Sequence, residues 1–181
     1  MARSKAEEAL GNSLKETYER LRREGLLLVS ALPRGRPNIM TIGWGLFGRF
    51  WADPYFMVAV RHSRYTHGLI EKSKEFTVNV PRRGMEKIVD FCGTVSGRDH
   101  DKFKEMGLTA MKAKRVSVPI ISECSIHYEC RVLFQTEVFP NRITKGVHYR
   151  WYRSEDYHTL YFGKVVSLYK SPGRGKRRQS K

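Results

Sequence analysis

The sequence predicts a mainly β fold with short helices, and among such folds a β-barrel. Short runs of apolar or alternating residues, typical of strands, occupy both ends of the chain and are separated by segments rich in Gly and Pro. The helix-like segments between them are short and lack the regular strand–helix rhythm of a doubly wound sheet. Many short strands joined by tight turns favour a barrel over an open sheet.

A surface helix is expected first, over residues 4–24. Apolar residues recur there at helical spacing and form one stripe, at Ala9, Leu10, Leu14, Tyr18 and Leu21. Gly25 follows directly and is a typical residue for ending a helix.

Three strands are expected next, over residues 26–32, 38–44 and 55–60. Their apolar runs are separated by two segments that we interpret as turns, "PRGRP" at 33–37 and "GLFGRFWADP" at 45–54.

The middle of the chain combines one more strand with two short helices. Residues 75–80 alternate as a strand with one buried face does. The segments "GMEKIVDFCG" (84–93) and "DHDKFKEMG" (99–107) are expected to be helical. Strand-like runs complete the chain at 125–139, 147–154 and 157–169.

We interpret the chain as one domain because it contains neither an internal repeat nor a linker of shifted composition. The expected organisation is an N-terminal helix (1–24), a barrel domain (25–169) and a flexible, disordered basic tail (170–181). The tail holds six Lys or Arg residues and no acid, so the net charge of +16 falls to +10 without it. Such a tail either contacts RNA, DNA or anionic lipid, or is an ordinary solvated end.

Composition argues against several classes of protein. No run approaches the roughly 20 apolar residues of a membrane helix, and the start lacks the apolar region of an export signal, so a cytoplasmic protein is expected. The histidines are scattered, so no metal site is expected. Cys124 and Cys130, six residues apart in a strand-like run, would be about 20 Å apart, too far for a disulfide. With Cys92 they are expected to be buried or partly buried reduced thiols.

Hydrogen-bond donors gather where the segment "RHSRYTHGLIEKS" changes from strand to helix. Thr66 is expected to cap the helix, so that free N–H groups and the positive end of the helix dipole face the preceding residues. Arg61 and Ser63 have the same strand parity and project to one side, while Arg64 and Tyr65 add donors at the turn. The cluster suits a phosphate; alternatively it only caps the helix and exposes its arginines to water.

A second donor cluster lies in the segment "GTVSGRDHDKF", which precedes a helix expected to begin at Asp99. It offers small residues for close backbone approach and two cations, at Gly93, Ser96, Gly97, Arg98 and Lys102. A Ser-Gly-Arg turn before a helix also suits an anion. The alternative here is again a simple helix cap with solvated cations.

Five segments in order resemble one known family: "NIMTIGW", "RHSRYTHGLIEKSKEFTVNVP", "FCGTVSGRDHDKF", "ECRVLFQTEV" and "YHTLYFGKVVSLY". Over about residues 25–169 the sequence is similar to the flavin reductase-like family of FMN-binding split-barrel proteins, which includes flavoredoxins and flavin reductases. The resemblance implies a split β-barrel and a homodimer with FMN at the subunit interface.

The resemblance also implies which residues bind the cofactor. Those beside the flavin ring are Asn38, Thr41, Gly43 and Trp44. Those that bind the phosphate and ribityl chain are Arg61, Ser63, Tyr65 and Thr66. The end of the next strand adds Asn79 and Val80, and the second donor cluster adds Cys92, Ser96, Gly97, Arg98 and Lys102. His158 is implied as a catalytic residue at the flavin rim or substrate side; alternatively it is a half-buried barrel histidine.

The implied function is that of an FMN-dependent oxidoreductase. NADH or NADPH would reduce bound FMN, and the electrons would pass to free flavin, oxygen, a metal complex or a protein. One alternative is a flavoredoxin-like electron-transfer protein that a protein partner reduces. Another is a nucleic-acid-binding barrel, favoured by the net charge and by the basic and aromatic residues of "HYRWYR". Residues 139–156 shape a substrate pocket, cover a dimer surface, or form an ordinary strand and loop.

Overall fold

The computed structural model describes the backbone of residues 5–172 and the side chains of residues 11–172. Its main element is a seven-stranded antiparallel sheet with the strand order β2-β1-β5-β8-β9-β4-β3. The strands are β1 (Leu26–Ser30), β2 (Asn38–Ile42), β3 (Gly45–Phe50), β4 (Asp53–Arg61), β5 (Glu75–Val80), β8 (Ile126–Glu137) and β9 (His158–Lys170). Two short strands, β6 (Ala110–Met111) and β7 (Ile120–Ile121), pair separately.

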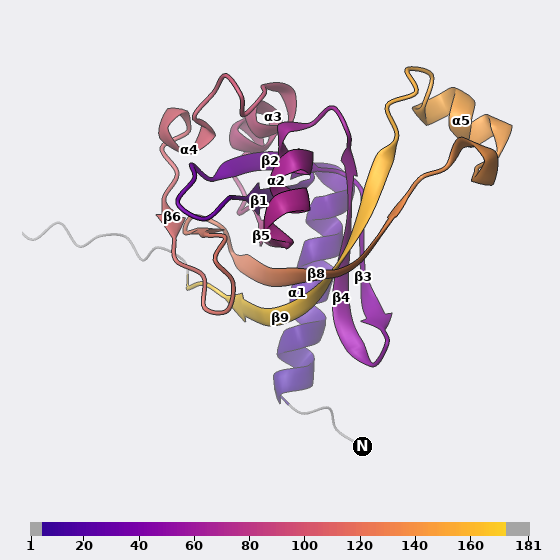
Figure 1. The fold of residues 1–181 in the computed structure, drawn as a ribbon. Coiled ribbons are helices and arrows are strands. Elements are labelled where there is room, and N and C mark those ends of the chain that lie inside the picture. Colours follow the sequence, from indigo (N-terminus) through magenta and orange to yellow (C-terminus); the bar gives the residue numbers. More distant parts are fainter. Residues whose placement is uncertain (1–4, 173–181) are drawn as a thin grey trace, which may run out of the picture.

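Helices lie around this sheet. They are α1 (Lys5–Arg23), α2 (Tyr65–Ser73), α3 (Glu86–Thr94), α4 (Lys102–Glu105) and α5 (Lys145–Trp151), with a 3-10 turn at Pro140–Arg142. Figure 1 shows α1 against the back of the barrel, α3 and α4 above β1 and β2, and α5 standing apart from the other helices.

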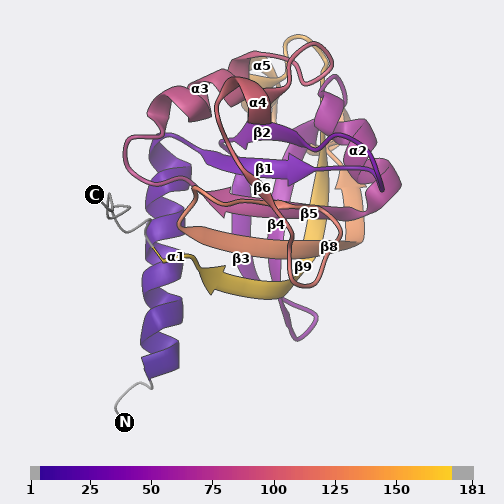
Figure 2. The same cartoon turned by 90° about the vertical axis from the view of Figure 1, so that its left-hand side faces the viewer.

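The sheet curls into a split barrel, as the sequence and its family resemblance predict (Figure 2). The register between β8 and β9 shifts at Glu129/Cys130, where β9 has the extra residue, and at Val132/Phe134, where β8 has it. Irregularities of this kind bend the strands. The curl brings β2, at one end of the strand order, close to β4 without a ladder between them. The barrel is therefore open along the line between β2 and β4.

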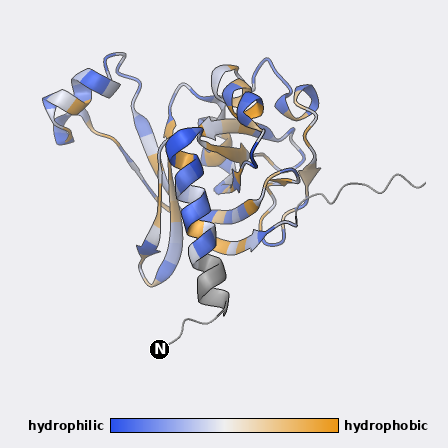
Figure 3. Ribbon diagram, turned by 180° about the vertical axis from the view of Figure 1, so that it is seen from behind, coloured by the Kyte–Doolittle hydropathy of each residue, from blue (hydrophilic) through white to orange (hydrophobic). Residues whose placement is uncertain are grey.

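Alternation along the strands produces two hydrophobic cores, one on each face of the sheet. In β1, Leu26 and Leu28 belong to the core inside the barrel, whereas Leu27 and Val29 belong to the core on the outer face. The inner core contains the largest fully buried rings, Phe56, Phe76, Tyr128 and Tyr161. In Figure 3 the strands carry much of the hydrophobic colour and the outer surface of α1 is hydrophilic.

Helix α1 turns inward a face that only partly matches the predicted stripe, of which Leu21 packs against the core inside the barrel. The side chain of Thr17 is buried, and its hydroxyl lies 2.7 Å from that of Tyr128. Tyr18, which belongs to the predicted apolar stripe, is 65% exposed. The prediction is wrong for Tyr18 because the helix turns a hydroxyl toward Tyr128 instead. Ala9 and Leu10 of the stripe lie outside the described side chains.

The predicted end of α1 is confirmed. Gly25 has a φ of +98°, and its N–H donates a 2.9 Å hydrogen bond to the Arg20 carbonyl. A left-handed residue at this position is the usual way to satisfy the last helical carbonyls.

The segment between β2 and β4 contains a strand where the sequence predicts only a turn. β3 pairs with β4 along its whole length, so only Trp51 and Ala52 remain in the loop. Both have positive φ values, as a two-residue hairpin loop of this kind requires. The strand is missed by sequence reasoning because such loops usually contain Asn, Asp or Gly.

Three glycines at the start of this hairpin, Gly43, Gly45 and Gly48, have the spacing of a dinucleotide-binding Gly motif. That motif acts between a strand and the helix that follows it. Here the segment continues into an antiparallel hairpin, so the spacing has no such role.

The strand predicted at 147–154 is wrong, because most of these residues form helix α5. Pairing of β8 with β9 ends at Glu137, and residues 138–157 continue beyond the sheet as an arm (Figure 1). Without a neighbouring strand, the backbone satisfies its own hydrogen bonds as a helix. Thr144 is the N-cap, and its hydroxyl accepts a 3.4 Å hydrogen bond from the Val147 N–H.

The second helix predicted in the middle of the chain begins later than expected. α4 starts at Lys102, and the N-cap is Asp101, whose carboxylate accepts a hydrogen bond from the Lys104 N–H. Asp99, the predicted start, lies in a turn in which its N–H donates to the Ser96 carbonyl.

The last strand runs past the predicted end of the domain. β9 includes Lys170, and the Ser171 N–H donates a 2.9 Å hydrogen bond to the Ser125 carbonyl. Arg82 in turn donates to the Ser171 carbonyl. The first residues of the predicted tail are therefore held to the barrel, and its residues 173–181 lie outside the described part of the chain.

Within the described residues, no helix is long and apolar enough to cross a membrane. The cysteines are buried and carry free thiols, in agreement with the prediction.

Candidate functional site

Two cavities lie along β2, at the opening of the barrel. The first, here called the aromatic cavity, measures about 180 Å³ and is lined by Met40, Thr41, Ile42, Gly43, Trp44, Ala59, Arg61, Arg64 and His158. The second, the donor cavity, measures about 120 Å³ and is lined by Asn38, Met40, Ser63, Arg64, Tyr65, Thr66, Cys92, Val95, Ser96, Gly97, Arg98 and Lys102. Met40 and Arg64 line both cavities. The two cavities are therefore neighbours and together form one groove.

The groove follows β2 because β2 is the edge strand of the sheet. Consecutive residues of β2 line the aromatic cavity, although their side chains alternate between the two faces. The edge of the strand, with backbone groups that no neighbouring strand pairs, therefore faces this cavity.

The donor cavity brings together the two donor clusters that lie far apart in the sequence. One wall is the turn between β4 and α2, and the other is the segment from the end of α3 to the start of α4. Nine predicted site residues meet here: Asn38, Ser63, Tyr65, Thr66, Cys92, Ser96, Gly97, Arg98 and Lys102.

Thr66 does not cap α2 as predicted. The N-cap position is Arg64, which makes no side-chain capping bond. Thr66 is buried in the first turn of the helix, and its hydroxyl accepts a 2.8 Å hydrogen bond from Nδ2 of Asn38. The prediction is wrong because this hydroxyl is committed to β2. The bond fixes the start of α2 against the start of β2.

Gly97 lies where only a glycine fits. A Cβ at this position would lie 1.8 Å from Oδ1 of Asn38, which is itself buried. Arg36 holds the same turn by donating a 2.8 Å hydrogen bond to the Gly97 carbonyl. The turn is therefore pressed against the start of β2, and its backbone forms part of the cavity wall.

Lys102 joins the segment between α3 and α4 to β2. Its buried ammonium group donates 2.8 Å hydrogen bonds to the carbonyls of Ile39 and Cys92. Burial lowers the pKa of Lys102. Burial also raises the pKa of the Cys92 thiol to about 11, although Lys102 acts in the opposite direction. The thiol is therefore neutral at pH 7.

Two arginines supply exposed positive charge to the donor cavity. Arg98 donates a 3.1 Å hydrogen bond to the Ser63 carbonyl, and its guanidinium carbon lies 5.5 Å from the centre of the Tyr65 ring. Arg64 is exposed, and its side chain forms no hydrogen bond or ion pair with the described residues. Its donors are thus available to a bound anion.

His158 and Trp44 form one wall of the aromatic cavity, with ring centres 4.8 Å apart. Nδ1 of the buried His158 lies 2.9 Å from the Tyr152 hydroxyl. Burial, reinforced by the charge of Arg61, lowers the pKa of His158 to about 4. At pH 7 the imidazole is neutral. It can form a hydrogen bond with a substrate, but it lacks the additional N–H proton of an imidazolium.

Arg61 contacts the arm and lies outside the donor cavity. Its guanidinium donates to the carbonyls of Asp156 and Trp151, and it lies 5.4 Å from the centre of the Tyr152 ring. That Arg61 binds a phosphate stays a prediction; in this structure its charge faces the aromatic cavity and its guanidinium contacts the arm.

Ser63 also contacts the arm at Asp156, as Arg61 does, although Ser63 lies in the turn after β4 and not in the strand. Its hydroxyl donates a 2.6 Å hydrogen bond to the Asp156 carboxylate. Burial acts to raise the pKa of Asp156, but the hydrogen bonds from Ser63 outweigh it, so the pKa is lowered. The carboxylate of Asp156 is therefore ionised and lies where the arm joins the barrel, at the edge of the donor cavity.

Asn79 and Val80, which the resemblance implies as cofactor-binding residues, line neither cavity of the groove. Asn79 is fully buried on β5, and its Oδ1 accepts hydrogen bonds from the Ile121 N–H and from Nδ1 of His127. Val80 is part of the core inside the barrel. Because β1 lies between β5 and β2, neither side chain reaches the cavities.

Apolar lining residues are the ones that motif reasoning misses, notably Met40, Ala59 and Val95. They carry no donor, so no chemical motif selects them. Met40 has the same strand parity as Asn38, and that alternation is the signal that could have found it.

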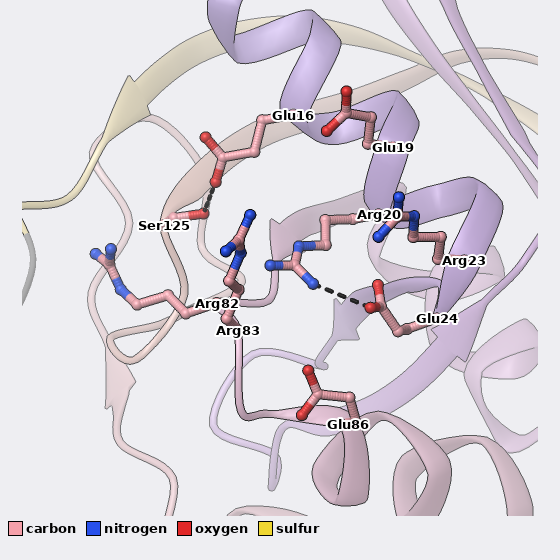
Figure 4. Close-up of a pocket in the computed structure, with 9 residues that line it drawn as sticks. All are labelled: Glu16, Glu19, Arg20, Arg23, Glu24, Arg82, Arg83, Glu86 and Ser125. Carbon is pink, nitrogen blue, oxygen red and sulfur yellow. Dashed lines mark hydrogen bonds and ion pairs between the residues drawn. The ribbon is translucent and has the colours of Figure 1, made fainter.

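A larger cavity, of about 570 Å³, lies on another part of the molecule (Figure 4). It is lined mostly by arginines and glutamates, from α1 and from the turn before α3: Glu16, Glu19, Arg20, Arg23, Glu24, Arg82, Arg83, Glu86 and Ser125. Some of these groups satisfy one another, since Arg20 pairs with Glu24 at 3.0 Å and Ser125 donates to Glu16 at 2.7 Å. It shares no lining residue with the groove along β2.

Residues 21–178 match the family model described as the flavin reductase like domain. An uncharacterized protein of Archaeoglobus fulgidus is 41% identical over 121 residues, which is 66% of this chain and 66% of that protein. A second uncharacterized protein, of Pyrococcus abyssi, is 34% identical over 72% of this chain and 64% of its own length. The chain thus spans slightly less than two thirds of these relatives.

Solved structures share the fold, among them the three that follow. The flavoredoxin of Desulfovibrio vulgaris (Miyazaki F) aligns with a TM-score of 0.66 and 25% identity over 81% of this chain and 68% of that chain. The flavoredoxin of Methanosarcina acetivorans aligns with a TM-score of 0.64 and 28% identity over 82% and 69%. An FMN-binding protein of Thermus thermophilus aligns with a TM-score of 0.63 and 24% identity over 81% and 71%, a likeness that shows the fold alone.

Proposed function

This chain belongs to the flavin reductase like family, and on that premise we propose that it binds FMN in the groove along β2 and uses it to oxidise NADH or NADPH. A flavin-related redox function is what the family and the fold support. FMN binding and the identity of the electron donor are the parts that we propose.

One observation carries the proposal: the donor cavity and the aromatic cavity form a single groove whose two ends differ chemically. FMN has the same asymmetry, with a dianionic phosphate at one end and a flat ring at the other. The donor set fits the phosphate, since Arg64 has free donors and Arg98 is exposed beside the backbone of Gly97. The ring end fits as well, because a Cβ built on Gly43 meets no atom within 4 Å.

When bound, FMN would supply the redox chemistry that links a hydride donor such as a reduced nicotinamide to an electron acceptor. The residues of this chain would hold and screen it. Arg64 and Arg98 would bind the phosphate. Lys102 would add positive charge to the cavity wall between α3 and α4, which its hydrogen bonds hold to β2. Trp44 shields the ring end from water. The neutral His158 orients a substrate through a hydrogen bond, and the scheme requires no protein nucleophile.

The first test uses Arg98→Ala, which removes a charge-assisted donor from the phosphate. The affinity for FMN should fall by about 1.5–3 kcal/mol, or about 10- to 150-fold. It is measured by titrating apoprotein with FMN and following the quenching of flavin fluorescence. Arg49→Ala, which removes an exposed arginine on β3, is the matched control and should leave the affinity unchanged. Equal affinities of Arg98→Ala and wild type would count against the site.

The second candidate is a flavoredoxin-like electron carrier, reduced by a protein partner. Two of the similar structures are named flavoredoxins, which favours this alternative. Stopped-flow mixing of the FMN-loaded protein with NADH and with NADPH distinguishes the two functions. Rapid bleaching of the flavin absorbance supports the enzyme, whereas no bleaching by either nucleotide supports the carrier.

We also propose a homodimer in which a second copy covers the apolar surface beside Trp44. Tyr18 and Leu46 are 65% and 66% exposed there, and with Leu21 and Met57 they line a shallow hollow. Light scattering should give twice the mass of the 21.1 kDa chain. Leu46→Glu, which places a charge in the hollow, should shift the protein to the monomer, while Leu133→Glu, an exposed leucine on β8, should not. A wild-type mass of a single chain would remove this part of the proposal.

A further inference from the structure

The arm carries cations that no carboxylate neutralises. Arg142, Lys145, Arg150 and Arg153 are exposed, and none forms an ion pair with the described residues. Of the two acids of the arm, Asp156 is bound to Ser63. The surface of α5 is therefore positively charged and open to a ligand.

Each of three arginines lies over an aromatic ring of the same arm. The guanidinium carbon of Arg153 is 3.8 Å from the centre of the Tyr149 ring, and that of Arg150 is 5.0 Å from the Trp151 ring. Arg142 and Phe139 make a looser pair at 5.9 Å. Tyr149 and Trp151 are nevertheless 66% and 43% exposed. Exposed aromatic rings beside arginines that these ring contacts hold in place suit a ligand with a planar base and phosphate groups.

This surface is continuous with the groove. Trp151, at the end of α5, packs edge-on against Trp44 with ring centres 5.1 Å apart. Its carbonyl also accepts a hydrogen bond from Arg61 in the aromatic cavity. A nicotinamide dinucleotide is two nucleotides joined by a pyrophosphate. If its nicotinamide ring enters the aromatic cavity, the rest of the molecule has to lie on the surface next to the mouth, where α5 ends.

We propose that α5 binds the adenosine half of the electron donor and that Arg150 and Arg153 bind its 2′-phosphate, so that the protein selects NADPH over NADH. Tyr149 and Trp151 provide the faces on which the adenine stacks. The inference rests on the proposed function, because it places the nicotinamide beside FMN. It assigns a role to the cations of the arm, which line neither cavity of the groove.

The test measures binding of the unreactive oxidised nucleotides, so that it does not depend on turnover. FMN-loaded protein is titrated with NADP⁺ and with NAD⁺ by calorimetry, and the quenching of tryptophan fluorescence is followed in parallel. NADP⁺ should bind at least ten times more tightly than NAD⁺. The double variant Arg150→Gln/Arg153→Gln should lose this factor, with NAD⁺ affinity and FMN retention unchanged. Lys112→Gln/Arg115→Gln, an exposed pair elsewhere on the molecule, removes the same charge and should keep the preference.

The outcomes separate the inference from the proposed function. If the protein retains no FMN, the proposed function fails and the inference fails with it. If FMN is retained but the two nucleotides bind equally, or the α5 variant keeps the preference, only the inference is overturned. It is also overturned if a single-stranded oligonucleotide binds with the same dependence on Arg150 and Arg153 while NADP⁺ does not. A change of mass in the α5 variant would assign this surface to a second copy of the chain and would likewise overturn the inference.

Discussion

Gly97→Ala is expected to weaken FMN binding by about 100-fold or more, equivalent to about 2.8 kcal/mol. The added Cβ would lie 1.8 Å from Oδ1 and 2.6 Å from Cγ of Asn38, and 3.1 Å from the Tyr65 ring. Asn38 is buried and bound to Thr66, so it can move aside only by giving up that bond. If the turn moves instead, the backbone and Arg98 leave the phosphate position. Either adjustment deforms the donor cavity.

A double-mutant cycle tests this steric explanation. FMN affinity is measured for Gly97→Ala, Asn38→Ala and the pair together, with thermal unfolding recorded for each. In the Asn38→Ala background the methyl group added by Gly97→Ala meets no amide. The loss of FMN affinity caused by Gly97→Ala should therefore be much smaller in this background than in wild type. Gly68→Ala is the matched control, since its Cβ meets nothing within 4 Å in α2, and it should leave the affinity unchanged. Additive losses in the cycle would show that crowding of Asn38 is not the cause.

The second large effect is a loss of stability as the pH falls from about 6.5 toward about 4. His127 is fully buried, with Nδ1 2.8 Å from Oδ1 of Asn79 and Nε2 2.8 Å from the Ser171 hydroxyl. Burial, followed by the charges of Arg82 and Lys114, lowers the pKa of His127 to about 4. In this pH window the unfolded chain binds more protons than the folded one, so protonation favours unfolding. The contribution of His127 is complete above pH 6.5 and decreases by up to about 3 kcal/mol near pH 4.

The contribution of His127 is isolated by comparing how steeply the free energy of unfolding depends on pH in wild type and in a His127 variant. Urea unfolding of wild type and His127→Gln is measured between pH 4 and pH 7.5, because other groups, His158 among them, titrate in the same direction. The variant should be less stable at pH 7 but should lose less stability on acidification. Parallel curves for wild type and His127→Gln would contradict the assignment.

Local patterns predict most of the elements of this fold. The apolar run of β1, the alternation in β5, the strand-like run of β9, the helix before Gly25 and the helix after Met85 all follow from interactions between residues close in sequence. The failures share one cause. β3 and α5 depend on whether a neighbouring strand is present, and that is decided by the sheet as a whole. The alternating aromatics of 147–151 have no strand to pair with, so they form a helix.

The candidate site divides in the same way. The motifs and the family resemblance select fourteen residues that line one groove, because turns rich in donors and small residues are visible in the sequence. The motifs and the resemblance do not show which of these donors already form hydrogen bonds within the protein. Arg61 meets the carbonyl of Asp156, Thr66 meets Asn38, and Asn79 meets His127, each pair separated by 28 residues or more.

The sequence by itself thus determined the family, the barrel class and the two clusters of donors, since each of these follows from the order and spacing of residues along the chain. Only the tertiary structure decided that the clusters share one cavity, that Arg61 serves the arm, and that Asn79 is sealed in the core. The physical reason is that a buried hydrogen bond depends on which surfaces meet when the sheet closes, and residues far apart in the chain meet only then.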